Sequence, residues 1–225
     1  GFTGPRIFAE KYDVTVDVVE IDPAVVSAAK EYFRVNETEE LHIYTADGRE
    51  FLETTDHTYD LIVLDAYRKN AVPFHMTTQE FFALAHDRLD EDGLLLANVI
   101  SAPSGGGSAF FRAEYKTMDR VFEQVYAFRT HDSTVVQNVE VIASKRDIRF
   151  TSAELRWRNS HRDIGYDVGD AINRSVDSVE TDDVPVLRDE RAPVDRLLDP
   201  MLGREYVLEE AGVVSSDPRP VSGIG

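Results

Sequence analysis

The sequence predicts an α/β fold built on a doubly wound, mostly parallel sheet. Three observations support this prediction. Apolar, strand-like runs alternate with amphipathic helical stretches from the start of the chain to about residue 145. The run VTVDVVEI at residues 14–21 is rich in β-branched residues and nearly continuously apolar, which is typical of a strand buried on both faces. The connections are short, as in sheets whose strands are joined by crossover helices.

The expected strands are short apolar runs bounded by polar or turn-forming residues. They span residues 14–21, 41–45, 59–64, 94–100, 124–130 and 135–143. Helices are expected at residues 24–33, 49–54, 79–89, 109–122, 152–160 and 169–179. The last two strands follow each other closely, so we expect an antiparallel pair at the far edge of the sheet.

Two helix starts carry recognisable capping residues. Asp22 stands in the cap position of the first expected helix after a strand, and Pro23 is its first residue. Thr77 is followed three residues later by Glu80, the spacing of a capping box. These signals indicate strand–turn–helix units with defined connections.

The pattern loosens beyond residue 145. We expect one domain at residues 1–145, a C-terminal extension packed on it at residues 146–210, and a flexible tail at residues 211–225. Residues 1–13 read as the helix that follows a first strand, yet no strand precedes them. A doubly wound sheet places its first strand centrally, so the domain is expected to be N-terminally truncated.

The composition excludes several classes of function. Asp and Glu number 42 against 24 Lys and Arg, a formal charge of -18 that disfavours nucleic acid as a partner. The absence of cysteine excludes disulfide scaffolds, thiolate metal sites and cysteine nucleophiles. Dense carboxylates indicate a halophilic surface, and the alternative is an ordinary acidic protein.

The chain shows no apolar run long enough to span a bilayer. We therefore expect a cytoplasmic protein, or the cytosolic domain of a membrane protein. A small cationic molecule would be attracted by the acidic field.

Ligands of open α/β sheets bind beyond the carboxyl ends of the strands. In this sequence, polar residues or glycines stand at these ends. Glu20 ends the first expected strand, where a carboxylate can accept both hydrogen bonds of a ribose diol; the alternative is a solvated side chain. Asp47 with Gly48 ends the second strand, and its carboxylate can accept a hydrogen bond from an adenine amino group or form an ordinary turn. Asp22 is most simply a helix cap.

Asp65 ends the apolar run DLIVLD, so a carboxylate emerges from a hydrophobic sheet into the presumed cleft. It is our first candidate for a general base, and the alternative is a turn residue. Asn98 and Ser101 are the polar residues at the end of the next strand, and we assign them no role. The glycines at 105–107 lack phosphate-loop spacing and are expected to form a flexible loop over substrate. The scattered histidines predict no metal site.

Four segments together resemble a known family: VDVVEIDPAVVSAAKEYF, TADGREFL, YDLIVLDAY and VPFHMTTQEFFALAHDRLDEDGLLLANV. Their order and spacing over residues 1–145 are similar to those of the spermidine synthases. These are the polyamine aminopropyltransferase branch of the S-adenosylmethionine-dependent methyltransferase superfamily. The resemblance implies a Rossmann-like fold of the class I methyltransferase type. The likeness is strongest to domains fused to membrane segments.

The resemblance also implies roles for individual residues. Glu20 would hold the ribose and Asp47 the adenine of decarboxylated S-adenosylmethionine, with Asp22 and Gly48 beside them. Asp65 would deprotonate an amine acceptor such as putrescine, and Tyr67 and Arg68 would contact that substrate. No metal is required, and a homodimer is common in the family.

One position departs from the family pattern. Arg68 stands where the family has a second aspartate, and a guanidinium repels an ammonium group. Two alternatives therefore stay open beside aminopropyl transfer. One is methyl transfer from S-adenosylmethionine, which Arg68 favours because it can pair with a substrate carboxylate. The other is a non-catalytic nucleoside-binding domain of a membrane protein.

Overall fold

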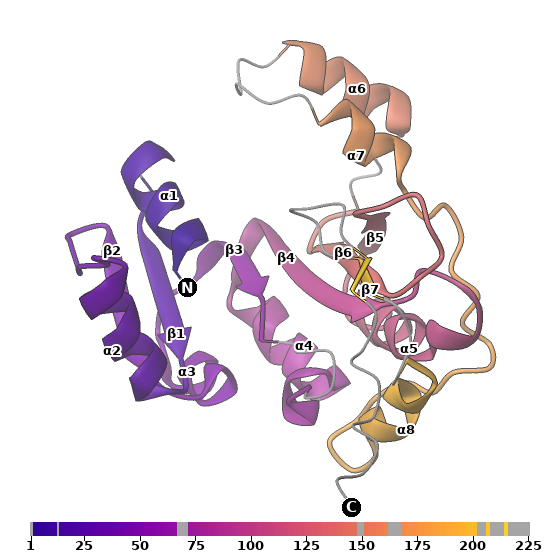
Figure 1. Ribbon diagram of the computed structural model, residues 1–225, viewed down its shortest axis with the longest axis horizontal. Coiled ribbons are helices and arrows are strands. Elements are labelled where there is room, and N and C mark those ends of the chain that lie inside the picture. The colour runs from indigo at the N-terminus through magenta and orange to yellow at the C-terminus, as the bar shows by residue number, and fades with distance from the viewer. Residues whose placement is uncertain are drawn as a thin grey trace, which may run out of the picture. The chain divides into compact units, whose positions relative to one another are not determined.

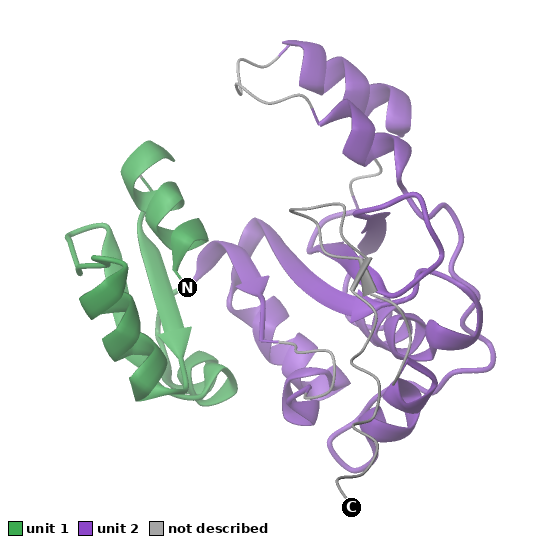
Figure 2. Ribbon diagram, viewed as in Figure 1, with its two compact units in different colours: residues 1–57 green, residues 58–225 purple. Residues whose placement is uncertain are grey.

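A computed structural model describes residues 2–12, 14–66, 72–147, 151–161 and 168–201, and the backbone of residues 206–207 and 214–215. The chain divides into two compact units, Gly1–His57 and Thr58–Gly225 (Figure 2). Each unit is described by itself below.

The described residues of unit 1 form two parallel strands and three helices (Figure 1). The order is α1 (Thr3–Tyr12), β1 (Val16–Glu20), α2 (Pro23–Tyr32), β2 (Leu41–Thr45) and α3 (Gly48–Thr54). The strands pair in parallel with Val16 opposite Leu41. Ala9 of α1 and Ala29 of α2 are buried in one apolar cluster with Leu41, against which Val18 packs. These small side chains let both helices approach the same face of the strand pair.

Unit 2 is built on a four-stranded sheet of order β3-β4-β6-β5. Its strands are β3 (Tyr59–Leu64), β4 (Leu89–Ser101), β5 (Gln124–Arg129) and β6 (Gln137–Ser144). Its α-helices are α4 (Gln79–Asp87), α5 (Ala109–Met118), α6 (Ser152–His161), α7 (Gly169–Asn173) and α8 (Val194–Leu198). Short 3₁₀ helices span Phe74–Met76, Gly105–Gly107 and Asp199–Met201. Tyr206–Val207 and Val214–Ser215 form a separate strand pair, β7 with β8.

The strand pairing makes the protein a mixed α/β fold. β3 and β4 are parallel, whereas β4 with β6 and β6 with β5 are antiparallel. The expected antiparallel pair at the far edge is therefore confirmed. The sheet of unit 2 is less parallel than predicted, because β6 returns against β4 as well as against β5.

Strand β4 starts five residues earlier than predicted. Tyr59 lies opposite Leu89 and Leu61 opposite Leu94, so the extra residues on β4 form an irregularity in the ladder. The expected turn at residues 90–93 is thus part of the strand. A Cβ on Gly93 would lie 2.8 Å from the Leu89 Cβ, which explains why glycine occupies this position.

The two faces of β4 differ in burial. Leu95, Ala97 and Val99 are fully buried, and helices α4 and α5 pack against this strand. On β3, Leu61 and Val63 are 39% and 51% exposed. Leu61 pairs with Leu94. Because successive side chains of a strand point to opposite faces, Leu61 and Val63 lie on the face opposite to the buried Leu95, Ala97 and Val99. The helices of unit 2 therefore cover one face of β3 and β4 more completely than the other.

Residues 180–191, here named the C-terminal strap, bind α5 along its length. Lys116 Nζ donates to the carbonyl oxygens of Thr181 and Val184, each at 2.8 Å. Arg112 forms an ion pair with Asp183, with one N–O distance of 3.0 Å. This guanidinium lowers the pKa of the Asp183 carboxyl, chiefly through the hydrogen bond.

The strap also contacts the first turn of α4. The predicted capping box was wrong about which threonine is the N-cap. Thr78, not Thr77, is the N-cap, and its side chain accepts from the Phe81 backbone N–H. Thr78 Oγ1 donates to Asp189 at 2.6 Å, and Glu80 accepts from the Asp189 N–H at 3.0 Å. Glu80 is therefore used to hold the strap instead of the helix start.

Two helices end earlier than predicted. α5 ends at Met118, and α7 ends at Asn173, six residues before the expected end at 179. After α7 the chain runs along β5 as an additional segment at the edge of the sheet. The Arg129 N–H donates to the Arg174 carbonyl, and the Val176 N–H donates to the Ala127 carbonyl. Pairing with β5 outcompetes the helical continuation.

The predicted tail at residues 211–225 lies outside the described residues, apart from the backbone of β8. Across the part of the chain that the structure describes, every helix is too short or too polar to cross a membrane.

We predict that Thr117→Val loosens the C-terminal strap. Thr117 is fully buried, and its Oγ1 donates to the Ala113 carbonyl at 2.6 Å while accepting from the Leu187 N–H at 2.9 Å. Valine leaves a buried N–H unpaired, so the free energy of unfolding should fall by about 1–3 kcal/mol. Urea unfolding and amide exchange at Leu187 measure the effect. The exposed Thr58→Val is the matched control, and equal stability of both variants would contradict the assignment.

Candidate functional site

The acidic candidates of unit 1 lie together at the carboxyl ends of β1 and β2. Glu20 lies opposite Thr45, and the Ala46 N–H donates to the Glu20 carbonyl at 3.2 Å. Asp47 and Gly48 follow directly. The predicted grouping of Glu20, Asp22, Asp47 and Gly48 at one edge is therefore present, because parallel strands end on the same side.

Glu20 is held by the turn that follows it. Its Oε1 accepts from the Asp22 N–H at 3.0 Å, and Asp22 Oδ1 accepts from the Ala24 N–H at 2.8 Å. Asp22 is thus the N-cap of α2, as its position after the strand predicted. Glu20 is half-buried, and its second carboxylate oxygen has no partner among the described residues. That oxygen can accept a hydrogen bond from a ligand hydroxyl.

Asp47 caps α3. Its Oδ1 accepts from the backbone N–H groups of Arg49 at 2.8 Å and Glu50 at 3.3 Å. These bonds fix the carboxylate at the start of the helix, where the helix dipole stabilises its negative charge. A structural role for Asp47 is thereby established, and its predicted contact with adenine stays a prediction.

Asp65, directly after β3, forms a hydrogen-bonded pair with Asn98, near the carboxyl end of β4. Register places Leu64 beside Ala97, so the next residues of both strands are neighbours. Asn98 Nδ2 donates to Asp65 Oδ1 at 2.9 Å. The Asn98 Oδ1 is buried and has no partner within the described residues. The amide thus fixes one oxygen of the Asp65 carboxylate by donating to it.

Asp65 is more open than the sequence suggested. It was expected to emerge into a cleft, but the residue is exposed, as are the Leu61 and Val63 side chains of the same face. The bond from Asn98 uses Oδ1, and Oδ2 has no partner among the described residues. The pair thus offers an oriented carboxylate with one oxygen available to accept a proton.

The glycine loop follows β4 at the same end of the sheet. Ser101 and Ser108 are fully buried, and their hydroxyls donate to the Gly107 and Gly105 carbonyl oxygens at 3.1 and 2.6 Å. Gly105 has φ +74°, which only glycine adopts without strain. The expected flexible cover is therefore a tight turn fastened by its own serines.

Tyr67 and Arg68, the predicted substrate contacts, lie outside the described residues. The Asn98–Asp65 bond was missed, although Asn98 had been noted as a polar strand end. The signal was available: Asp65 and Asn98 are the first polar residues after the apolar runs of two neighbouring parallel strands, so they can lie side by side.

Two histidines approach one carboxylate elsewhere in unit 1. Asp17 faces His42 Nδ1 at 2.9 Å and His57 Nδ1 at 3.4 Å. Among the described residues, no group of three or more His, Asp or Glu side chains has the geometry to hold a metal ion.

We predict that Asn98→Asp destabilises the protein in a pH-dependent manner. Two carboxylates would then face each other across the strands, which raises the pKa of one in the folded state. A raised folded pKa means that the penalty is absent at acidic pH and develops as the pH rises. The loss should be about 1–3 kcal/mol at neutral pH, measured by urea unfolding at pH 4.5 and 7.

The double exchange Asp65→Asn with Asn98→Asp restores one amide and one carboxylate. It should recover most of the lost stability at neutral pH. A penalty that is the same at both pH values would show that the two side chains do not interact.

Comparison with known proteins places the chain in a family. The family model of the spermine/spermidine synthase domain matches residues 8–140. The polyamine aminopropyltransferase of Vibrio vulnificus is 32% identical over 133 residues, which are 57% of this chain and 43% of the relative. The probable polyamine aminopropyl transferase of Bifidobacterium longum is 26% identical over 195 residues, 80% of this chain and 42% of the relative. The chain thus spans less than half the length of these curated relatives.

Solved structures share the fold. A probable spermidine synthase from Corynebacterium glutamicum matches with a TM-score of 0.60 and 24% identity, covering 72% of this chain and 60% of that one. Human methyltransferase-like protein 13 matches with a TM-score of 0.57 and 17% identity, covering 67% of this chain and 71% of that one. At such identities the likeness concerns the fold, which is that of methyltransferase-like proteins.

The matched segment, residues 8–140, is more than half of the chain and contains β1 to β5, with both groups of acidic candidates. The sequence resemblance is thereby confirmed: this chain belongs to the spermine/spermidine synthase family.

Proposed function

We propose that the chain is the catalytic part of a polyamine aminopropyltransferase, which moves an aminopropyl group from decarboxylated S-adenosylmethionine to an amine such as putrescine. The observation that carries the proposal is the Asp65–Asn98 pair. It presents an oriented carboxylate at a strand end, where α/β sheets bind their ligands, in a chain of this family.

The proposed reaction needs a general base and the correct orientation of its two substrates. An alkylammonium acceptor has no lone pair, so a proton must leave it before it can attack. Asp65 takes that proton through the oxygen that Asn98 leaves available. The C–N bond then forms as the C–S bond of the sulfonium breaks, the sulfur keeps the electron pair, and methylthioadenosine leaves. Orientation of the two substrates supplies much of the acceleration.

The donor nucleoside is assigned to the carboxylates of unit 1. Glu20 would accept from the ribose hydroxyls through the oxygen not bound to Asp22, and Asp47 with Gly48 would lie at the adenine. Because backbone N–H groups already orient Glu20 and Asp47, ligand binding would cost little side-chain entropy.

The nature of position 68 supports an alternative. Arg68 stands where the family resemblance calls for a second aspartate, and with Tyr67 it is assigned to the acceptor. A guanidinium pairs with a carboxylate, which favours an acidic acceptor and methyl transfer from S-adenosylmethionine. Aminopropyl transfer is the better supported of the two because the matched family model is that of spermine/spermidine synthases.

We further propose that an upstream strand and glycine loop complete the domain of residues 1–145. Among the described residues, β1 pairs only with β2, and β3 only with β4, so each keeps one unpaired edge. Residues 146–210 are proposed as an extension of this domain, supported by the buried contacts of the strap. A cytoplasmic location, a homodimer and fusion to a membrane domain belong to the same proposal.

We predict that Asp65→Asn abolishes most of the turnover while leaving donor binding intact. Loss of a general base lowers kcat by roughly 10² to 10⁴. The experiment uses the chain extended upstream, with calorimetric binding of decarboxylated and intact S-adenosylmethionine and a kinetic assay with putrescine. Asp60→Asn, an exposed carboxylate on the same strand, is the matched control.

The outcomes separate the alternatives. Tighter binding of the decarboxylated donor with turnover supports aminopropyl transfer. Preference for the intact donor, with methylation of an acidic acceptor, replaces it with methyl transfer. Nucleoside binding by a folded wild-type protein that turns over neither donor leaves a non-catalytic domain.

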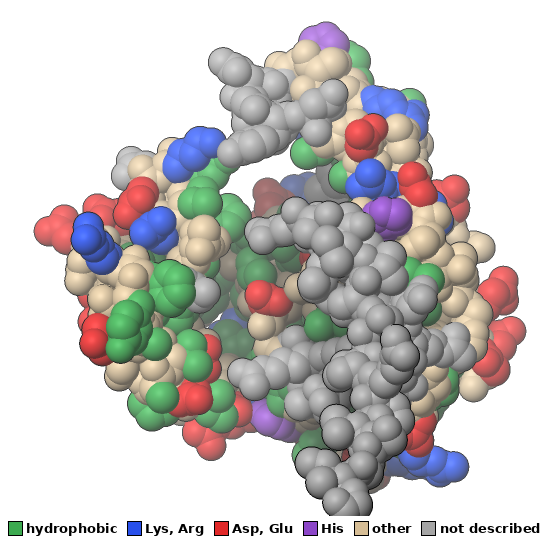
Figure 3. Space-filling view, viewed as in Figure 1, with side chains coloured by type: hydrophobic (Ala, Val, Ile, Leu, Met, Phe, Trp, Pro, Cys, Tyr) green, Lys and Arg blue, Asp and Glu red, His purple; other side chains and the backbone are tan. Residues whose placement is uncertain are grey.

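A halophilic surface is proposed from the charge of -18. Acidic side chains are visible on both units (Figure 3). About 1 M salt shortens the Debye length to roughly 3 Å and removes most of their mutual repulsion. We predict a higher midpoint of urea unfolding in about 1 M potassium chloride than in dilute buffer. Equal midpoints would contradict halophily without affecting the proposed reaction.

A further inference from the structure

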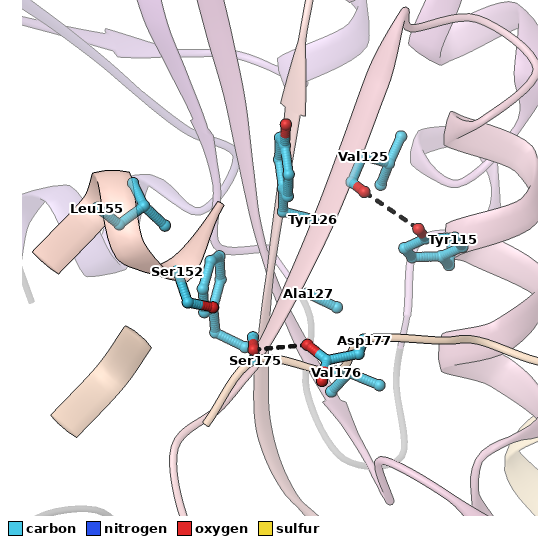
Figure 4. A pocket seen from close by; sticks show the side chains of 10 residues that line it. Tyr115, Val125, Tyr126, Ala127, Ser152, Leu155, Ser175, Val176 and Asp177 are labelled. Carbon is cyan, nitrogen blue, oxygen red and sulfur yellow. Dashed lines mark hydrogen bonds between the residues drawn. The ribbon is translucent and has the colours of Figure 1, made fainter. Parts of the chain in front are cut away.

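A cavity of about 250 Å³ lies at the outer edge of the sheet of unit 2. Its walls come from β5, from α5 on one side and α6 on the other, and from residues 175–177 (Figure 4). β5 and β3 are opposite ends of the strand order, so the cavity is remote from Asp65 within the sheet. None of the roles assigned above uses it.

The outer edge of β5 is already hydrogen-bonded, so a further strand cannot pair with it there. The Ala127 carbonyl and the Arg129 N–H are already bonded to residues 176 and 174. The next outward carbonyl, that of Val125, accepts from Tyr115 Oη at 3.0 Å. The cavity is therefore formed by side chains and is not a vacant strand position.

Tyr115 is suited to remain a donor. Burial raises the pKa of its phenol, and the nearby Asp119 carboxylate and Tyr126 add to this effect. The hydroxyl therefore stays protonated over the physiological range and keeps its bond to Val125. The wall of the cavity is fixed in place, and Asp119 adds negative potential beside it.

The lining has the chemistry of a cation site. Tyr126 and Phe128 supply aromatic rings, and Ser152 and Ser175 supply hydroxyl oxygens. Asp177 is the charged group among the described lining residues. Among the described residues that line the cavity there is no Lys, Arg or His. Aromatic faces and carboxylates both attract ammonium groups, and Leu155 and Val176 offer apolar contact to an alkyl chain.

Asp177 is held toward this lining by its neighbour. Ser175 Oγ donates to Asp177 Oδ1 at 2.9 Å, as Figure 4 shows. Ser175 itself is fixed because it bridges to Phe128 in the strand pairing. The second carboxylate oxygen has no partner among the described residues, so it can accept from a ligand N–H.

The start of α6 does not call for an anion instead. Ser152 is the first residue of α6, and a helix start attracts negative charge. Here Glu154 meets that need, because its Oε2 accepts from both the Thr151 N–H and the Thr151 hydroxyl at 2.8 Å. The start of α6 therefore does not require an anion in the cavity.

We propose that this cavity binds a small aliphatic ammonium ion, with Asp177 as its counter-charge and Tyr126 and Phe128 against its alkyl chain. The volume equals roughly eight water molecules at their share of liquid volume, enough for an amine of a few carbons. The proposal does not depend on aminopropyl transfer, because it rests on the lining alone. If both hold, one protein carries two amine sites at opposite edges of the sheet.

The test measures binding of n-butylammonium to the full chain in an Asp65→Asn background, which weakens amine binding at the candidate active site. The probes are the backbone amide resonances of Tyr126, Ala127 and Val176. We expect saturable shifts with butylammonium and at least tenfold weaker binding of the neutral butanol and the anionic butyrate.

Asp177→Asn should weaken butylammonium binding at least tenfold, and Ser175→Ala should weaken it less. Asp170→Asn, an exposed carboxylate on α7, is the matched control and should leave binding unchanged. Equal binding of butanol, insensitivity to Asp177→Asn, or shifts confined to residues away from β5 would each overturn the proposal. Asp177 is exposed, so its substitution is compatible with folding.

Discussion

Parallel pairing of β3 with β4 positions Asp65, because the carboxyl ends of parallel strands lie at the same edge of the sheet. The pairing needs a crossover through α4, whose first turn is capped by Thr78. Thr78 in turn is bound by Asp189, more than a hundred residues further along the chain. The position of one exposed carboxylate thus depends on a parallel ladder, a helix cap and the C-terminal strap together.

Much of this arrangement could be predicted from local sequence. Strands 41–45 and 59–64 match the structure residue by residue, since apolar β-branched runs bounded by polar turns leave little choice. The start of β4 and the end of α7 were wrong because both are decided by partners distant in sequence: Tyr59 and Leu89 pair across an irregular ladder, and residues 174–176 join β5. Local propensity carries no information about such contacts.

The candidate site divides in the same way. Glu20, Asp47 and Asp65 could be named as candidates because strand ends can be recognised in a sequence, whereas the bond from Asn98 depends on register. Their roles, like those of Tyr67 and Arg68, stay predictions. The two amine sites proposed here share a design: a carboxylate is oriented by one hydrogen bond, from an amide at Asp65 and from a hydroxyl at Asp177, and keeps its other oxygen available. In an acidic protein this arrangement gives cations a defined place to bind amid a diffuse attractive field.

The strap also has a consequence for the order of events during synthesis. The contacts within unit 1 join residues 1–57, so they can form before unit 2 has been translated. Unit 2 buries Leu187, Val194, Leu198 and Met201 in its core, so its helices stay partly uncovered until these residues have been translated. Long-range closure of this kind is slow and exposes apolar surface in the meantime. The core of unit 2 is therefore completed only when α8 and the 3₁₀ helix that follows it have been translated.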